Sequence, residues 1–255
     1  MPQQLPLRLA MLWLTNPFAR TWLHTKSPQL EVTTALSGTS NKSAPGPSGI
    51  GYKLVKWAFK AHPNFILDIF DATLHLRHHP WMTAKVMILP KPNKEDYSAT
   101  KAYRPVSLLE CFGKMLEKIV ANQFTSDSNL HNILPLAQFE SRPYHSATDT
   151  CCLLWYKAET TIQSGRISSV LLFDISRFFD HLDPAFTSWV LKHLGIDDQM
   201  ITWVRHFMTR RTITMEFNNH TMDPLNPDLG TPQGSLLSSI LLVLVTGPIL
   251  CLTES

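Results

Sequence analysis

The sequence predicts a helix-rich α+β fold with a small antiparallel sheet. Apolar residues at helical spacing recur in clusters along the chain, rather than in regular alternation with strands. Residues 211–218 alternate between apolar and polar side chains as a strand does, with Ile213, Met215 and Phe217 on one face. The chain has 255 residues, of which 44% are hydrophobic, so it can bury a substantial core.

The first part of the chain is expected to be mainly helical. Prolines interrupt any long periodicity in residues 1–27, and we expect a linker with short helices over residues 1–36. Gly, Pro and Ser crowd residues 37–49, and this composition requires a loop. Apolar spacing predicts helices over residues 30–36, 51–61 and 63–76.

Both strands and helices are expected in the remainder. Residues 85–89 form a short β-branched run closed by Pro90 and Pro92, which predicts a strand. The clearest helical stripe lies over residues 106–124. Asn218-Asn219 suits a turn into a second strand before Gly230. The other expected elements are helices over 147–163, 184–194 and 197–208, a buried strand over 168–175 and a buried helix over 236–252.

The chain is mildly basic, and its charge is unevenly distributed. Lys and Arg number 23 against 20 acidic residues, which gives a net charge of +3 and a pI near 8.7. Six lysines and Arg104 lie between Lys85 and Lys118. This basic segment is compatible with nucleic-acid binding and equally with a solvated, lysine-rich face.

Cysteine spacing and apolar segments argue against several other classes of protein. The four cysteines have neither the spacing of a zinc site nor that of a disulfide framework. Residues 9–14 are apolar but lack the features of a signal peptide, so secretion is not expected. Residues 236–252 are uncharged but include Ser, Thr, Gly and Pro, which favours a buried helix; a membrane tail anchor is the alternative.

Asp174 is the first candidate for a catalytic residue. The apolar run Val170 to Phe173 delivers its carboxylate to the expected end of a strand, where the chain turns. One interpretation is a carboxylate that is solvated or caps the following helix. The other is a ligand for Mg²⁺, a hard ion that prefers carboxylate and carbonyl oxygens.

Segments spread over roughly residues 37–250 resemble, in order, motifs of the reverse transcriptases of non-LTR (LINE-type) retrotransposons. Residues 171–180 read L-L-F-D-I-S-R-F-F-D, which is similar to the family pattern D-x-x-x-A-F-D. Residues 230–241 read G-T-P-Q-G-S-L-L-S-S-I-L, which is similar to G-x-P-Q-G-S-P-L-S-P-I-L. The other matching segments are K-S-A-P-G-P-S-G-I at 42–50, I-L-P-K-P-N-K at 88–94, Y-R-P-V-S-L-L at 103–109, and Q-F with R-P and S within 138–146.

This resemblance implies the fold and activity of an RNA-directed DNA polymerase. The fold would be a right hand, with a fingers-like region over residues 37–165 and a partial palm over 166–255 that holds only the first two palm motifs. The implied partners are an RNA template, a DNA primer and a dNTP, with no membrane. The implied compartment is the nucleus or the cytoplasm.

The resemblance also implies roles for individual residues at the nucleotide. Lys91 and Arg104 would contact the triphosphate, for which an ammonium and a guanidinium both suit. Phe179 would lie beneath the incoming sugar and leave no room for a 2′-hydroxyl. Gln233 would lie beside the nucleotide, and Gly234 would allow the template backbone to approach closely.

Further residues are implied at the nucleic acid and at the metal. Lys94, Lys101 and Arg142 would contact the nucleic acid through its phosphates, and binding would therefore be salt-sensitive. Mg²⁺ would be held by the carboxylate of Asp174 and the backbone carbonyl of Ile175.

The sequence departs from the family pattern in several places. Glu140 stands in place of a glycine, Phe178 in place of a small residue and Ser48 in place of an aspartate, while Leu236 and Ser239 replace two prolines. The family's paired-aspartate motif, F/Y-x-D-D, does not occur in the sequence. We therefore expect a chain that is catalytically incomplete on its own. The alternatives are a non-catalytic nucleic-acid-binding remnant and a translated fragment without a selected role.

Overall fold

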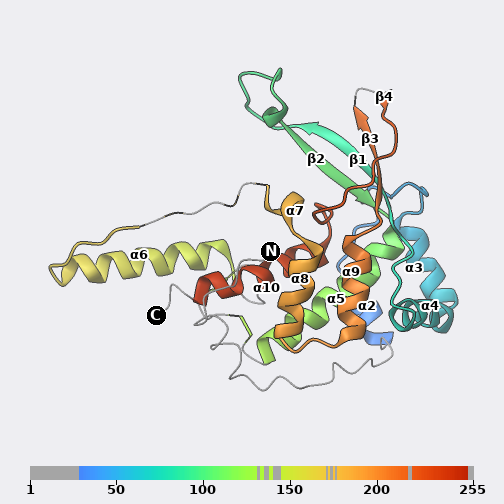
Figure 1. Ribbon diagram of the computed structural model, residues 1–255, viewed down its shortest axis with the longest axis horizontal. Coiled ribbons are helices and arrows are strands. Elements are labelled where there is room, and N and C mark those ends of the chain that lie inside the picture. Colours follow the sequence, from blue (N-terminus) through green and yellow to red (C-terminus); the bar gives the residue numbers. More distant parts are fainter. Residues whose placement is uncertain are drawn as a thin grey trace.

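The computed structural model describes residues 29–130, 133–134, 138–139, 145–170, 172, 175, 177–217 and 220–251. The expectations for residues 1–27, for Arg142 and Asp174, and for the turn at Asn218-Asn219 lie outside these residues. Among the described residues, the helices other than the one over Ala147–Gln163 form one body, and a small sheet extends from it as an arm (Figure 1).

The sheet is built on a long hairpin. Strand β1 (Thr83–Pro90) pairs antiparallel with β2 (Tyr103–Leu109), and a short 3₁₀ turn, η1 (Thr100–Ala102), lies in the connecting loop. Strand β3 (Thr212–Phe217) lies on the other side of β1 and pairs with the short strand β4 (His220–Thr221). The strand order is β2-β1-β3-β4, so β2 is an edge strand.

The α+β class is confirmed, but the sheet is mixed rather than wholly antiparallel. Strands β1 and β3 are parallel, with Thr83 opposite Thr212 and Met87 opposite Glu216. Parallel neighbours need a long crossover, and here the segment between the two strands contains β2 and five helices, from α5 (Cys111–Leu130) to α9 (Asp198–Met208). The pairing therefore joins segments that are far apart in the sequence. The alternation of apolar and polar residues within β3 does not indicate whether β3 runs parallel or antiparallel to its neighbour.

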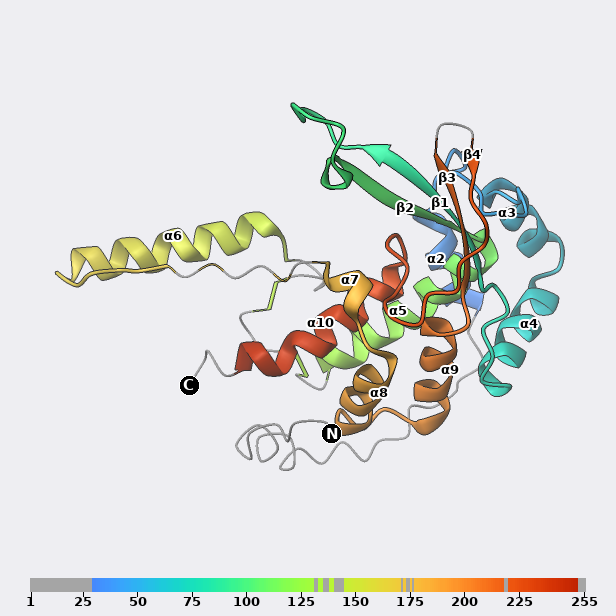
Figure 2. The same ribbon diagram turned by 45° about the horizontal axis from the view of Figure 1, so that its top comes forward.

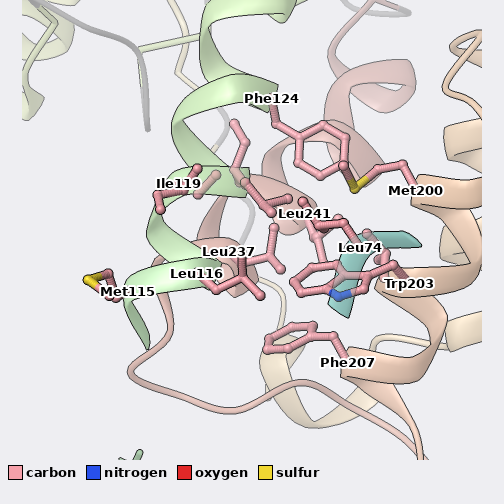
Figure 3. Packing of buried hydrophobic residues seen from close by; sticks show 14 of the residues in the cluster. Leu74, Met115, Leu116, Ile119, Phe124, Met200, Trp203, Phe207, Leu237 and Leu241 are labelled. Carbon is pink, nitrogen blue, oxygen red and sulfur yellow. The ribbon is translucent and has the colours of Figure 1, made fainter. Parts of the chain in front are cut away.

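Helix α5 (Cys111–Leu130) is the centre of the helical body. Helices α2 (Gln29–Ser37), α3 (Tyr52–Ala61) and α10 (Leu236–Cys251) pack against it. Helices α8 (Pro184–His193) and α9 (Asp198–Met208) form a pair, with α10 against α8 and α4 (Pro63–His75) against α9. Figure 3 shows the resulting core, in which Leu116, Trp203 and Leu237 meet from three helices.

Local signals explain where several helices begin. Asp183 and Asp197 precede α8 and α9, and each accepts a hydrogen bond from the backbone N–H two residues later. Pro184 occupies the first turn of α8, where a missing N–H costs nothing. Ser146 and Asp149 form a reciprocal capping box at the start of α6 (Ala147–Gln163). These ends agree with the sequence predictions to within one or two residues.

Helix α6 differs from the other long helices because none of its residues is buried. It extends away from the helical body in both views (Figures 1 and 2). Trp155 is 72% exposed on this helix.

Two predicted elements are wrong in part. The helix expected over residues 106–124 begins only at Cys111, because Val106 to Leu109 pair with β1 as part of β2. The strand expected over 168–175 is not seen: the described residues there belong to no strand, and Leu172 is 84% exposed. An apolar run forms a strand only where a neighbour supplies hydrogen bonds.

The buried helix expected over 236–252 is confirmed as α10, which lies across α5 with Leu237 and Leu241 in the core. Within the described part of the chain, no helix combines the length and apolar character needed to cross a membrane.

Candidate functional site

The turn at Gly230–Ser235 brings three distant segments of the chain together. The N–H of Gly230 donates to the carbonyl of Leu182 at 3.0 Å, and the N–H of Thr231 donates to the carbonyl of Phe179 at 2.8 Å. Phe179 lies in the short helix α7 (Phe178–His181). The end of one predicted motif is therefore hydrogen-bonded to the start of another, although a long stretch of sequence separates them.

Gly230 is required for this close approach. Its φ is +83°, and an added Cβ would lie 2.7 Å from the carbonyl oxygen of Asp180 and 2.8 Å from that of Phe179. Both contacts are with backbone atoms, which cannot rotate away. Any larger residue would force α7 and the turn apart.

The edge strand β2 holds the other end of the turn. The N–H of Ser107 donates to the carbonyl of Gln233 at 3.3 Å. Gly234, with φ of +120°, has its Cβ position 3.3 Å from the carbonyl oxygen of Ser107. The outward-facing backbone groups of an edge strand are open to such contacts. The turn is therefore docked on β2 at one end and on α7 at the other.

The turn leaves its central residues accessible. Gln233 and Gly234 are exposed, whereas Thr231 and Ser235 on either side are buried. The side chain of Phe179 is half-buried beside them. The structure thus brings together three of the predicted nucleotide-binding residues and presents Gln233 to solvent.

Buried charges lie beneath the turn. Oγ of Ser235 donates to Oε2 of Glu117 at 2.5 Å, and Glu117 is only 2% exposed. Nε2 of His79 lies 3.4 Å from Oε1 of Glu117, but the two atoms do not have the geometry of a hydrogen bond. Nη2 of Arg211 donates to the carbonyl of Gly230 at 2.7 Å. Burial lowers the pKa of Arg211 to about 10, and the charge of Glu117 opposes this shift.

The predicted basic residues lie on the β1–β2 hairpin and its loop. Lys94, Lys101 and Arg104 are exposed there. Lys91 is half-buried, and its Nζ donates to the carbonyl of Lys101 at 2.8 Å. The hydroxyl of Tyr97 also donates to the carbonyl of Lys91, which further closes the loop. Lys91 therefore holds the loop together, while the other three cations face solvent.

The described residues do not form a metal site. They contain no group of three or more His, Cys, Asp or Glu side chains placed to hold an ion. Of the two predicted ligands, Asp174 lies outside the described residues, and Ile175 is 50% exposed and offers a backbone carbonyl alone. The adjacent pair Asp197 and Asp198 is used at the start of α9, where Asp197 caps the helix. Strand β3 follows the opposite end of α9, after Met208.

Sequence reasoning missed the buried residues that support the turn. Ser235 lies within a matching segment but is given no role by the resemblance, Glu117 lies within a predicted helical stripe, and Arg211 is predicted only as the start of a strand. One signal was available for Glu117. It is the single acidic residue between Met115 and Ala121, a stretch in which every other residue except Lys118 is apolar.

Comparison with known proteins identifies the class. A model of the reverse transcriptase (RNA-dependent DNA polymerase) family matches residues 89–255. The chain belongs to this family, and the prediction made from its motifs is confirmed.

The relatives that the chain resembles include proteins of mobile elements. The chain is 25% identical over 221 residues to the X-element transposon protein of Drosophila melanogaster, whose name marks it as a probable RNA-directed DNA polymerase, and the match covers 83% of this chain. It is 23% identical over 218 residues to the RNA-directed DNA polymerase from the mobile element jockey of Drosophila funebris, covering 85% of this chain. The matches span 23% and 24% of those two proteins.

Solved structures that resemble the chain include a partial Cas6-RT-Cas1–Cas2 complex. The likeness has a TM-score of 0.45 with 14% sequence identity, and it covers 86% of this chain and 32% of the other.

Proposed function

We propose that this chain supplies the nucleotide- and template–primer-binding surface of an RNA-directed DNA polymerase. One observation supports this most strongly: the Gly230–Ser235 turn is hydrogen-bonded both to the carbonyl of Phe179 and to the edge of β2. Three segments that match the family therefore converge on one exposed turn. The proposal is in line with the relatives, which are named as polymerases of mobile elements.

The residues at the turn have distinct proposed roles. Gln233 contacts the incoming nucleotide, and Gly234 lets a nucleic-acid backbone approach the turn. Phe179 packs beneath the sugar and selects a dNTP. Arg104, which is exposed on β2, and Lys91 contact the triphosphate. For Lys91 this role competes with its hydrogen bond to the loop.

Nucleic acid is proposed to bind along the hairpin. Lys94 and Lys101 are exposed near its end, and such cations bind phosphates at any sequence. Arg142 is proposed to line the template path. We assign residues 37–165 to a fingers-like region and 166–255 to part of a palm, acting in the nucleus or the cytoplasm.

Divalent metal ions are general in this family, and we propose Asp174 and Ile175 as the ligands that this chain contributes to Mg²⁺. Since the described residues do not form an ion site by themselves, the roles proposed for Gln233, Phe179 and Arg104 are limited to binding and orienting the nucleotide.

Equilibrium binding to an RNA–DNA hybrid tests the proposal. The full chain should bind a labelled RNA template annealed to a DNA primer, with an affinity that falls as salt rises. Lys94→Glu combined with Lys101→Glu should weaken binding and reduce the salt slope, by about 0.7–0.9 for each phosphate that the variant no longer neutralises. Lys53→Glu combined with Lys60→Glu on α3 is the matched control, because it makes the same charge change at two exposed sites away from the hairpin.

The outcomes separate the possible functions. Weaker binding for the hairpin variant alone, together with tighter binding when a matching dNTP is added, supports the proposal. Hybrid binding with no response to any dNTP points instead to a nucleic-acid-binding remnant. Equal effects of the hairpin and control variants would show that the hairpin is not the binding surface.

A further inference from the structure

The turn is held at both ends by buried charges of opposite sign. At its start, Nη2 of Arg211 donates to the carbonyl of Gly230 at 2.7 Å. At its end, the carboxylate of Glu117 accepts from Oγ of Ser235 at 2.5 Å. Arg211 is 6% exposed and Glu117 is 2% exposed, so neither charge can be solvated.

Charges at these two buried positions carry a cost in stability. Burying a carboxylate or a guanidinium carries a large desolvation cost, and apolar side chains of similar volume are often as stable or more so. The residues one turn after Glu117 on the same face of α5, Val120 and Ala121, belong to the apolar core. Charges retained in such a place are best explained by the groups that they hold.

The turn has little internal structure of its own. Within it the N–H of Ser235 donates to the carbonyl of Pro232 at 3.3 Å, and Pro232 has no N–H to offer. Its other anchors come from outside: α7, β2, Arg211, Glu117 and the hydroxyl of Ser238 on α10, which lies 2.5 Å from that of Thr231. Fixing residues that would otherwise be mobile costs conformational entropy, and these anchors offset that cost.

We infer that Glu117 and Arg211 are positioning residues that fix the two ends of the Gly230–Ser235 turn and thereby set the place of Gln233 at the nucleotide. The inference rests on the proposed function, because the turn must face the nucleotide for its position to matter. Both residues are buried and act through backbone or side-chain groups of the turn.

Three variants test the inference by changing the donor or the acceptor of the hydrogen bond between Ser235 and Glu117. Ser235→Ala removes the donor, Glu117→Gln keeps an acceptor but removes the charge, and Glu117→Ala removes both. The matched control is Ser128→Ala, a buried serine on the same helix whose hydroxyl has no hydrogen-bond partner among the residues that the structure describes. If Glu117→Ala does not fold, Ser235→Ala still tests the same contact.

The rate of amide hydrogen exchange over residues 230–235 measures how firmly the turn is held. The affinity for dNTP in the presence of an RNA–DNA hybrid measures whether the position of the turn matters for nucleotide binding. We expect Ser235→Ala to speed exchange about tenfold and to weaken dNTP binding about tenfold, the effect of losing one hydrogen bond to a charged group. Glu117→Gln should lose less than Glu117→Ala, since its amide oxygen can still accept from Ser235. Hybrid affinity should change less than twofold in each variant, which a general loss of structure would not produce.

The results distinguish failure of this inference from failure of the proposed function. If dNTP binding and turn exchange in Ser235→Ala and Glu117→Gln match those of Ser128→Ala, the inference is overturned. If exchange at the turn rises in Ser235→Ala and Glu117→Gln but the unaltered chain binds no dNTP, the proposed function fails, and the role of these residues at the nucleotide fails with it. Their role in holding the turn would still be supported. Faster exchange throughout the chain, rather than at the turn, would also overturn the inference.

Discussion

Gly230→Ala is the substitution that most directly tests how α7 and the turn meet. The φ of Gly230 is +83°, and the Cβ of alanine would lie 2.7–2.9 Å from three backbone atoms of Phe179 and Asp180. We expect a marked loss of stability, because backbone atoms at this distance must move. That movement would strain the hydrogen bonds that Gly230 and Thr231 donate to Leu182 and Phe179.

The magnitude follows from two separate contributions. An L-residue in the left-handed region costs about 1–2 kcal/mol. Weakening one or two backbone hydrogen bonds adds roughly 0.5–1.5 kcal/mol each. The free energy of unfolding should therefore fall by about 2–4 kcal/mol.

Urea denaturation followed by circular dichroism measures the loss, and Gly49→Ala separates its two parts. Gly49 has φ of +74°, but nothing lies within 4 Å of its Cβ position. Gly49→Ala should therefore lose only the conformational contribution, about 1–2 kcal/mol. Equal losses in the two variants would show that α7 does not approach the turn as described.

Three further predictions concern stability. Trp203 is fully buried and stacks on Phe207, so Trp203→Ala should lower the free energy of unfolding by about 3–5 kcal/mol in urea denaturation, and a loss below about 1 kcal/mol would contradict its place in the core. Lys85 forms an ion pair with Glu216 across β1 and β3 at the surface, so Lys85→Ala should change the free energy of unfolding by no more than about 1 kcal/mol. A larger loss in thermal denaturation would show that the pair contributes more than a surface ion pair does. Burial, with Cys111 and Glu117 nearby, raises the pKa of Tyr52 to about 12. Because the unfolded chain loses this proton first, stability is full below pH 10 and falls by about 2 kcal/mol towards pH 12; Tyr52→Phe should remove that fall, and an unchanged pH profile would contradict the shift.

Helices could be predicted from sequence because their signals are local. Apolar spacing, with Asp183 and Asp197 before the first turns, defines α8 and α9 almost to the residue. The segment from Val106 to Leu109 was misread because its apolar residues also continue the helical stripe of α5, and only the pairing with β1 decides between the two structures. The parallel contact of β1 with β3 joins residues far apart in the sequence, and no local pattern encodes it.

The residues of the candidate site likewise include some that the sequence predicts and others that only tertiary packing reveals. Phe179, Gln233 and Gly234 were predicted from motif resemblance, and the structure places them at one turn. The supporting residues Glu117 and Arg211 were missed, because a charged residue in a helix or strand pattern is normally assigned to the solvent face. Their burial depends on packing between α5, α10 and the turn, which the sequence does not display.

The central claim is that the Gly230–Ser235 turn, held between α7 and β2, faces the nucleotide. Its most direct test is photo-crosslinking of a photoreactive dNTP to the full chain bound to an RNA–DNA hybrid, with peptide mapping of the label. We expect label in residues 230–235 or in the adjoining residues 103–109 and 177–182, and we expect excess unmodified dNTP to compete it away. Competable label confined to α3, α4 or α6 would show that the turn does not face the nucleotide.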